Sequence, residues 1–363
     1  MIGDTSGGKV IVVVGGQFGS EGKGAICAYL AQMEPGALLA MRVAGPNAGH
    51  TVIGLDGEEY KFRHVPVAAV VRPDAELALG AGSEIDFEVL QEELDMTNEV
   101  WKTRHRILID PTSTVIEPEH KVMEAGIGTG TTGKGIGAAR AERLLRRAEL
   151  VSGTTFDKEN TVDWGDTTGL AIGWLKSGGT VMIEGTQGYG LGQHAGFYPY
   201  VTSGDCRATD FLAMAGIPPW ADYVRELEIW VVLRTYPIRI AGNSGPLVEE
   251  LTWEDLAHRT NGHIKPEFTT VTKKMRRIGE WEKGLAMDAI DANGGPKTVK
   301  VALTFADYVI PDLADTTIIS ASEAGLREIS QWLDNRLPSP YRNCIKLIGT
   351  GQDSVIDTRV GSI

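Results

Sequence analysis

Short runs of apolar residues, separated by polar or glycine-rich segments, follow one another along the chain. The first run, Val10–Val14, shows no alternation of apolar and polar positions, which is typical of a strand buried on both faces of a parallel sheet. A glycine-rich turn over Gly15–Gly24 follows, and Ala25–Gln32 then has the composition of a helix. This order of strand, loop and helix favours a nucleotide-binding α/β fold.

Further apolar runs predict more strands, and helical patterns separate several of them. The predicted strands are Ala75–Leu79, Ile107–Ile109, Val181–Ile183, Ile229–Leu233, Val299–Leu303 and Lys346–Ile348. Helices are predicted over Phe87–Thr97, Ala138–Leu150 and Ser322–Leu333, the last of which begins with a residue suited to an N-cap. Without repeats or linkers, the pattern predicts one α/β domain over residues 1–363.

Composition and charge narrow the class of protein. A hydrophobic content of 42% suffices for a full core and excludes a disordered chain. With 48 acidic against 35 basic residues, the net charge of −13 argues against nucleic acid or a membrane surface as partner. The apolar runs are far shorter than the roughly 20 residues of a membrane helix. The chain has only three cysteines, which are far apart, so we expect no disulfides. Because the amino terminus also lacks a signal pattern, we expect a cytoplasmic protein.

The segment Gly15–Gly24 is the first candidate for chemistry. Its glycines permit a close backbone approach, so that successive N–H groups can surround phosphate oxygens, and Lys23 adds a positive charge. The spacing is not that of a standard P-loop, which requires glycine in place of Gln17 and Ser or Thr in place of Gly24. A purely structural turn that packs the helix on the strand remains an equal alternative.

The segment Arg42–Thr51 contains the one histidine that we expect to act in chemistry. His50 follows a Gly-Pro-Asn-Ala-Gly turn and stands beside an amide and a hydroxyl that suit a phosphate or a purine edge. It is a candidate general acid or electrostatic stabiliser. The other six histidines are expected to be surface or packing residues, because no pair has metal-ligand spacing.

A third glycine-rich loop, Gly128–Gly137, carries hydroxyl groups and a lysine. Hydroxyls and backbone amides can hold a monophosphate, and Arg146 and Arg147 can add a guanidinium fork. The commoner alternative is that these arginines form the solvated face of an arginine-rich helix.

Two later segments complete the candidates. Ile183–Gly188 places the amide of Gln187 at a strand end, where α/β sheets bind ligands, unless it merely turns the chain; Tyr198–Ser203 follows it. Glu267–Arg277 is rich in hydroxyls and runs into several cations, which suits a small dicarboxylate or a sugar. A short basic loop for nucleic acid is the alternative, although the rest of the chain is acidic.

In this order, the segments resemble the motifs of the adenylosuccinate synthetase family over nearly the whole chain. The family motifs G-x-Q-W-G-D-E-G-K-G, N-A-G-H-T, T-T-G-[RK]-G-I-G, E-G-[AT]-Q-G and Y-P-Y-V-T-S match Gly15–Gly24, Asn47–Thr51, Thr131–Gly137, Glu184–Gly188 and Tyr198–Ser203, and S-T-G-P-D matches Gly349–Asp353 more weakly. The resemblance implies an α/β fold related to P-loop proteins, with a mostly parallel central sheet flanked by helices, as well as a homodimer and Mg²⁺. It also implies transfer of a γ-phosphoryl group to O6 of a purine monophosphate, followed by displacement of the phosphate by the amino group of L-aspartate.

The same resemblance implies a role for each matching residue. The catalytic residues would be Ser20, Lys23, His50 and Gln187, and Mg²⁺ would contact Ser20 and the carbonyl of Gly49. The purine monophosphate would contact Ser20, Asn47, Thr131, Thr132, Gln187, Thr202, Ile240 and Lys274, with Arg146 reaching into the partner subunit's site. Aspartate would contact Thr270, Val271, Thr272 and Arg276. The triphosphate donor would contact Gly19, Glu21, Gly22, Lys23, Gly24, Gly49, His50, Thr51, Phe305, Asp307, Gly349 and Gly351.

Three departures from the family motifs bear on the substrate. Ser20 replaces the aspartate that takes the proton from N1 of inosine monophosphate, and the loss of a positioned base costs roughly 10²–10⁴-fold on the same substrate. The smaller, neutral side chain leaves room for a purine 2-amino group. Phe305 replaces the lysine of the guanine-reading T-K-x-D element, which favours an adenine donor. Lys274 replaces an arginine beside the ribose, which leaves room for deoxyribose.

These departures are similar to those of the bacteriophage branch of the family, which makes a precursor of 2,6-diaminopurine for modified phage DNA. We therefore expect dGMP, L-aspartate and ATP or dATP as substrates, in the host cytoplasm. The nearest alternative is an adenylosuccinate synthetase that acts on inosine monophosphate with GTP or ATP. A nucleotide-binding switch has no use for Gln187, Thr202 and Arg276, and a scaffold without catalysis is at odds with Lys23, His50 and Gln187.

Overall fold

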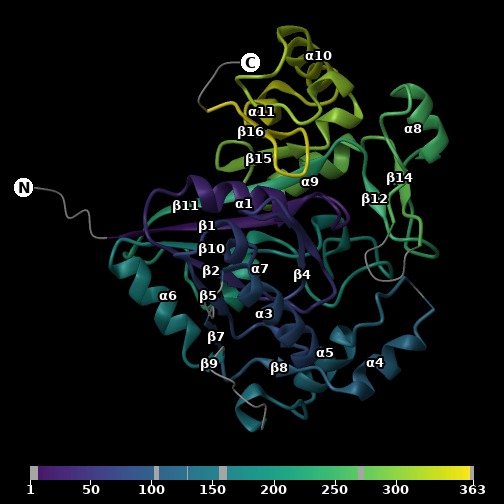
Figure 1. The fold of residues 1–363 in the computed structure, drawn as a ribbon. Helices are drawn as coiled ribbons and strands as arrows, with labels where there is room; N and C mark the ends of the chain where they lie inside the picture. Colours follow the sequence, from purple (N-terminus) through teal and green to yellow (C-terminus); the bar gives the residue numbers. More distant parts are fainter. Residues whose placement is uncertain (1–6, 102–105, 129, 155–161, 269–273, 360–363) are drawn as a thin grey trace, which may run out of the picture.

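A long twisted sheet forms the centre of the protein (Figure 1). The computed structural model describes residues 7–101, 106–128, 130–154, 162–268 and 274–359, and within them the sheet has ten strands in the order β17-β16-β15-β11-β1-β10-β2-β5-β7-β9. Neighbouring strands in this described part are parallel except β16 and β17. The strands are β1 (Gly8–Gly15), β2 (Leu38–Arg42), β5 (Glu76–Leu79), β7 (Ile107–Ile109), β9 (Val162–Trp164), β10 (Thr180–Glu184), β11 (Val224–Arg234), β15 (Val299–Thr304), β16 (Ile345–Gly349) and β17 (Val355–Asp357).

Helices cover both faces of this sheet, and β1 shows why its sequence is apolar throughout. Val10, Val12 and Val14 pack into one hydrophobic cluster, whereas Ile11 and Val13 pack into another. The first cluster includes residues of α6 (Thr167–Lys176), α7 (Ala208–Met214), α9 (Lys283–Ala292) and α10 (Glu323–Asp334). The second includes residues of α1 (Lys23–Met33), α2 (Ala68–Val71) and α3 (Phe87–Trp101). A strand between two such layers has no solvent-facing side, so alternation is absent.

Smaller elements extend from the central sheet. Figure 1 shows β12, β14 and α8 at one side, and α4 and α5 at the end far from α10. The small sheets pair β3 (His50–Ile53) with β4 (Glu59–Phe62), β6 (Glu84–Ile85) with β8 (Thr114–Val115), and β14 (Arg277–Gly279) with β12 (Ile238–Arg239) and β13 (Glu250–Leu251). The other helices are α4 (Pro118–Ala125), α5 (Ile136–Leu144), α8 (Trp253–Arg259) and α11 (Ser339–Arg342), with 3₁₀ turns at Val151–Gly153, Tyr189–Leu191, Ala306–Tyr308 and Pro311–Leu313.

Each strand and helix predicted from the apolar runs is present, with two differences of note. The helix predicted over Ala138–Leu150 ends at Leu144, and Arg146 has a left-handed backbone with φ 61°. The central strand Leu38–Arg42 was not predicted, because its leucines, alanine and methionine favour a helix as much as a strand. Ser322 does cap α10, since its hydroxyl accepts a hydrogen bond from the N–H of Gly325 at 3.0 Å.

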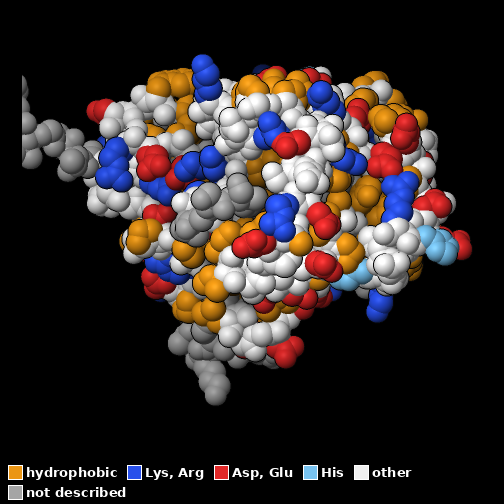
Figure 2. Space-filling model, turned by 90° about the horizontal axis from the view of Figure 1, so that it is seen from above, with side chains coloured by type: hydrophobic (Ala, Val, Ile, Leu, Met, Phe, Trp, Pro, Cys, Tyr) orange, Lys and Arg blue, Asp and Glu red, His pale blue; other side chains and the backbone are white. Residues whose placement is uncertain are grey.

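The face drawn in Figure 2 carries charges of both signs, with Lys and Arg side chains scattered among Asp and Glu side chains. The three cysteines are free and buried. Within the described ranges, the helices are too short or too polar to cross a membrane.

The carboxyl ends of the parallel strands meet at one edge of the sheet. The loop after β1 is joined there to the end of β11, because Gln17 Nε2 donates to the carbonyl of Arg234 at 3.1 Å and Gln17 Oε1 accepts from its N–H at 2.9 Å. Thr304, which ends β15, donates to the carbonyl of Glu21 at 2.6 Å. At this edge the order of the strands changes direction at β1, which lies between β11 on one side and β10 on the other. Such a switch in strand order is the usual ligand position in open α/β sheets.

Candidate active site

The loop after β1 is built around the buried carboxylate of Glu21. Its Oε1 accepts hydrogen bonds from the N–H groups of Gln17 at 3.0 Å and Gly19 at 2.7 Å. Its Oε2 accepts from Lys23 Nζ at 2.7 Å, and Lys23 also donates to the carbonyl of Gly19 at 3.2 Å. Gly22, with φ 79°, lets the chain turn from this loop into α1. Lys23 is therefore held at the start of a helix, as a phosphate-binding lysine requires.

His50 and Glu184 form a buried pair beside this loop. His50 Nδ1 lies 3.1 Å from Glu184 Oε2, and Glu184 Oε1 accepts from the N–H of Val67 at 2.7 Å. Burial, together with the charges of Arg42 and Lys23, lowers the pKa of His50 well below its usual value. Burial raises the pKa of Glu184 to about 7, against the opposing effect of Arg42. The ring is thus fixed by its Nδ1 while its Nε2 is buried and has no protein partner among the described residues.

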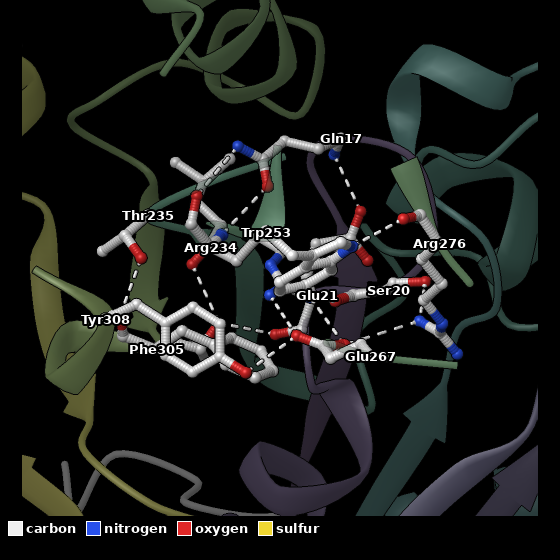
Figure 3. A network of polar contacts seen from close by, with 12 residues as sticks. Gln17, Ser20, Glu21, Arg234, Thr235, Trp253, Glu267, Arg276, Phe305 and Tyr308 are labelled. Atoms are coloured by element: carbon white, nitrogen blue, oxygen red, sulfur yellow. Dashed lines mark hydrogen bonds and ion pairs between the residues drawn. The ribbon is translucent and has the colours of Figure 1, made fainter. Parts of the chain in front are cut away.

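A second network surrounds Ser20 (Figure 3). Arg276 Nη1 donates to Ser20 Oγ at 2.5 Å, and Arg234 Nη1 donates to the Ser20 carbonyl at 2.9 Å. Glu267 Oε1 accepts from Arg234 Nη2 at 2.7 Å and from the hydroxyl of Tyr308 at 2.9 Å. The hydroxyl of Ser20 therefore faces a guanidinium group, and the predicted aspartate ligand Arg276 lies directly beside the predicted purine ligand Ser20.

Phe305 and Asp307 lie next to the same network. The Arg234 guanidinium covers the Phe305 ring at 3.8 Å from its centroid, and Tyr308 packs edgewise at 5.0 Å. Asp307 Oδ2 lies 3.2 Å from His263 Nε2. One face of the aromatic ring is thus occupied by an arginine, which leaves less of Phe305 for an adenine than the sequence alone suggested.

A pocket brings together Asn47, Gln187 and Thr202, three residues expected around the purine monophosphate. Gln187 has a left-handed backbone with φ 53°, a strained conformation that is enriched at functional sites. Arg140, which sequence reasoning missed, also lines the pocket and forms a two-point ion pair with Glu84 through bonds of 2.6 and 3.2 Å. The lining residues are Ala44, Gly45, Asn47, Ile136, Arg140, Thr186, Gln187, Thr202, Ser203, Gly204, Asp205, Cys206, Phe211 and Met214.

The loop that contains Thr131 and Thr132 is organised by a carboxylate of the protein itself. Glu124 accepts from the N–H groups of Gly135 at 2.8 Å and Gly137 at 2.5 Å, at the start of α5. These two amides are therefore already paired, and they are not the phosphate-binding amides that the loop predicted. The side chains of Thr131 and Thr132 are exposed.

Arg146 lies outside this assembly of residues. It is exposed, just beyond the end of α5, and its neighbours Leu144 and Leu145 are 83% and 56% exposed. On the adjacent α4, Val122 is 74% and Met123 is 56% exposed. Arg146 thus lies outside the site of its own subunit, in an exposed segment that carries both leucines and arginines.

The remaining predicted residues are distributed around the same edge of the sheet. His50 begins β3, whose Thr51 carbonyl packs closely against Gly24; Gly49 is exposed. Gly349 ends β16, and Gly351 lies against the carboxylate of Asp315. Lys274 is exposed, and Ile240 is partly buried. Thr270, Val271 and Thr272 fall outside the described residues, and their predicted role stays a prediction.

Several residues of the site escaped the sequence reasoning as individual ligands. Arg42, Glu184 and Arg234 are the last residues of their strands. Their position was the available signal, because charged residues that end buried strands collect at the ligand edge of a parallel sheet. Glu267 was visible only as the first residue of a hydroxyl-rich segment.

The chemistry of the donors decides how a magnesium ion fits. Among the described residues, no group of three His, Cys, Asp or Glu side chains converges as a metal site. The nearest carboxylate of the loop, Glu21, is paired with Lys23. Ser20 and the carbonyl of Gly49 offer neutral oxygens only. This donor set fits a magnesium ion held mainly by substrate phosphates, which is common for this metal.

Comparisons with known proteins identify the family. The adenylosuccinate synthetase family profile matches residues 12–163 and 163–315. The adenylosuccinate synthetase of Methanococcus aeolicus is 35% identical over 96% of this chain and 99% of its own length. That of Methanococcus maripaludis strain S2 is 37% identical over 96% and 98%.

Two solved structures share the fold. Succinoaminodeoxyadenylate synthetase of cyanophage S-2L, bound to dGMP and to dATP as an energy donor, is similar with a TM-score of 0.78 and 29% identity, covering 97% of this chain and 95% of that one. The fully ligated adenylosuccinate synthetase of Plasmodium falciparum shares the fold with a TM-score of 0.76 at 18% identity, covering 96% and 100%. The chain therefore belongs to the adenylosuccinate synthetase family and is a ligase that forms a C–N bond.

Proposed function

We propose that this ligase joins L-aspartate to C6 of dGMP and uses ATP or dATP as the phosphoryl donor. The products are N6-succino-2-amino-2′-deoxyadenylate, the nucleoside diphosphate and phosphate. The observation that carries the proposal is the neutral hydroxyl of Ser20, which faces Arg276 at 2.5 Å where the family has a carboxylate. The likeness to the cyanophage enzyme, whose structure holds dGMP and dATP, supports it.

The size and charge of Ser20 bear on the purine. A carboxylate at this position, in contact with Arg276 and close to Glu21, fills more space and offers only acceptors to the purine edge. A hydroxyl is smaller and can donate as well as accept. Because Arg276 can only donate, the Ser20 oxygen accepts that bond. The 2-amino group of a purine is itself a donor, so the change at Ser20 favours it through space and charge rather than through the hydroxyl hydrogen. A purine with a 2-amino group therefore gains room without an unpaired charge.

The replacement of the family's lysine by Phe305 supports an adenine donor. The structure has an aromatic ring and a guanidinium where the family reads guanine with a lysine, and Asp307 is engaged by His263 at 3.2 Å. The missing lysine, rather than the retained Asp307, therefore disfavours guanine as the donor base. The choice between ATP and dATP depends on the sugar, and the cyanophage structure contains the deoxy form.

The residues of the site divide the chemical work. Lys23 and those amides of its loop that Glu21 does not engage bind the transferring phosphoryl group and stabilise its charge. His50, oriented by Glu184, presents Nε2 toward the purine O6, and Gln187 binds the purine from the pocket side. Arg276 binds a carboxylate of aspartate. Mg²⁺, held by substrate phosphates with Ser20 and the Gly49 carbonyl, supplies further neutralisation of charge when bound.

The surface around Arg146 supports a homodimer. Val122, Met123, Leu144 and Leu145, which lie on or next to the contacting helices α4 and α5, are all more than half exposed, and exposed apolar surface is typical of interfaces between subunits. In this arrangement, Arg146 of each subunit contacts the purine monophosphate of the other.

A substrate panel tests the function. Purified protein is assayed with dGMP, GMP or inosine monophosphate, each with ATP, dATP or GTP, and the aspartate adducts are identified by mass spectrometry. We expect an adduct from dGMP with ATP or dATP. Ser20→Asp should lower kcat/KM for dGMP by about 10-fold or more, because the carboxylate reclaims the space and pairs with Arg276. An unchanged rate contradicts the volume argument.

The alternative is an adenylosuccinate synthetase that acts on inosine monophosphate. It is favoured by the curated relatives of that name, whose identity of 33–37% exceeds that of the cyanophage enzyme. Turnover of inosine monophosphate without turnover of dGMP would establish this alternative and reject the proposal.

A further inference from the structure

Glu267 lies between two arginines that come from distant parts of the chain. Its Oε1 accepts from Arg234 Nη2 at 2.7 Å and from the Tyr308 hydroxyl at 2.9 Å, while its Oε2 lies 3.5 Å from Arg234 Nη1 and 4.0 Å from Arg276 Nη1 (Figure 3). The Glu267 side chain is only 23% exposed. The hydrogen bonds of its side chain are therefore made to Arg234 and Tyr308, while its backbone carbonyl accepts from the N–H of Arg276 at 2.9 Å. The effect of its carboxylate on the Arg276 guanidinium is mainly electrostatic.

Arg276 is held on one side and open on another. Its Nη1 is bound to Ser20 Oγ, but its Nε is buried and has no hydrogen-bond partner among the described residues. Guanidinium groups bind carboxylates most strongly through two parallel N–H groups, so the edge that carries Nε suits a carboxylate. A buried donor without a partner costs free energy unless a ligand satisfies it.

The charged side chains around Ser20 carry an excess of one positive charge, which a bound anion can balance. Lys23, Arg234 and Arg276 are three cations, and Glu21 and Glu267 are two carboxylates in contact with them. Burial opposes the ionisation of Glu267, but Arg234 and Arg276 outweigh it and lower the pKa of this carboxyl. Glu267 is thus charged at neutral pH and balances one arginine, which leaves the other for a substrate carboxylate.

We propose that Glu267 is the positioning residue of the amino-acid subsite, and that it holds Arg234 and orients Arg276 so that the Nε edge of Arg276 receives a carboxylate of L-aspartate. This inference rests on the proposed function for the identity of the amino acid. Glu267 does not touch the substrate. It attracts Arg276 from 4.0 Å, close enough to orient the guanidinium and too far to occupy its donors. Arg234, fixed in turn, supports Ser20 through its carbonyl and packs on Phe305.

The next residue along the chain provides a matched control. Arg277 points to another carboxylate, Glu250, which accepts from Nε at 2.7 Å and from Nη2 at 2.6 Å in a two-point ion pair. Glu267→Gln and Glu250→Gln therefore make the same chemical change beside adjacent arginines of one segment, but only the first lies in the network of Ser20.

The test measures KM separately for aspartate, for the purine monophosphate and for the triphosphate in both variants. We expect Glu267→Gln to raise KM for aspartate by about 10-fold or more while KM for the triphosphate changes less than about 2-fold. Glu250→Gln should leave all three within about 2-fold. Tyr308→Phe, which removes only one hydrogen bond to Glu267, should raise KM for aspartate by a smaller factor, and Glu267→Asp should restore part of the loss.

The outcomes separate this inference from the proposed function. If Glu267→Gln changes KM for aspartate no more than Glu250→Gln does, or raises KM for all substrates equally, the inference is overturned. If Glu267→Gln does not fold, the same comparison is made with Tyr308→Phe, and an unchanged KM for aspartate overturns it. If the wild-type protein shows no aspartate-dependent turnover with any purine monophosphate, the proposed function itself fails.

Discussion

Two buried glutamates of the central sheet have pKa values shifted in opposite directions. Glu184 ends β10 at the ligand edge, and burial raises its pKa to about 7. Glu228 lies in β11; burial opposes its ionisation as well, but hydrogen bonds from Lys300, Lys9 and Trp230 lower its pKa to about 2. The two lysines lie 2.8 and 3.0 Å from the same oxygen of Glu228. The same side chain is therefore an acid near neutrality in one place and a permanent anion in the other.

The difference teaches how to tell a working carboxylate from a structural one. Around Glu228 the charges pair with one another, and the hydrogen bond from Trp230 at 2.9 Å completes the cluster. Around Glu184 the network ends in His50 Nε2, which has no hydrogen-bond partner in the described part of the chain, and the same holds for Arg276 Nε. Closed networks stabilise the fold, whereas open ones leave donors or acceptors for a substrate.

The largest difference between the two regions is expected when one lysine of each, Lys23 near Glu184 and Lys9 beside Glu228, is replaced by methionine. Lys23→Met should lower kcat on the order of 10²–10³-fold, because the variant loses the cation that stabilises the transferring phosphoryl group. Lys9→Met should leave kcat within about 2-fold while lowering the free energy of unfolding by about 1–2 kcal/mol, since Glu34 and Glu228 each lose an ion pair. Steady-state kinetics and urea unfolding provide the two measurements, and a loss of activity in Lys9→Met would refute the division.

The raised pKa of Glu184 gives the next largest effect. A carboxyl whose pKa is higher in the folded state stabilises the fold below its unfolded pKa of 4.5, and this contribution is lost as pH rises to about 7. Glu184→Gln removes the dependence, so its stability relative to wild type should improve between these pH values, on the order of 3 kcal/mol. Thermal unfolding of both proteins from pH 4.5 to 8 measures it. A difference that is constant with pH would contradict the raised pKa.

Glu228 should show a smaller effect of opposite sign. Because its pKa falls to about 2 in the folded protein, its contribution is present above the unfolded value of 4.5 and disappears as pH falls toward 2. Glu228→Gln should cost about 1–2 kcal/mol at pH 7, after allowance for solvent screening, and little at pH 2.5. The measurement is unfolding by urea at the two pH values. If Glu228→Gln lowers the free energy of unfolding equally at pH 7 and pH 2.5, the ion pairs of Glu228 do not determine this part of the stability.

Much of the fold was predictable because the buried strands are short and apolar on both faces. The β-branched residues of Val10–Val14 predict β1, and Ser322 predicts the start of α10 because its hydroxyl caps that helix. The strand Leu38–Arg42 could not be predicted from its own sequence, because it is extended only through its pairing with β10 and β5. The early end of α5 depends on the left-handed backbone of Arg146, which its sequence does not favour.

The site was predictable as a set of loops and less so as a set of contacts. Asn47, Gln187 and Thr202 do share one pocket. The pairing of Ser20 with Arg276, however, joins segments with no local signal for each other, and Glu124 takes amides that the loop alone assigned to phosphate. The ligand roles of the individual residues and the single-domain organisation stay predictions.

The bond between Ser20 and Arg276 spans 256 positions of the chain, and that between Thr304 and Glu21 spans 283. A partly opened chain in which these segments separate therefore loses the contact between the predicted purine ligand Ser20 and the predicted aspartate ligand Arg276. Bound substrate should therefore stabilise the protein against global unfolding more than against local fraying. Protection against proteolysis by bound nucleotide should then appear as one cooperative event.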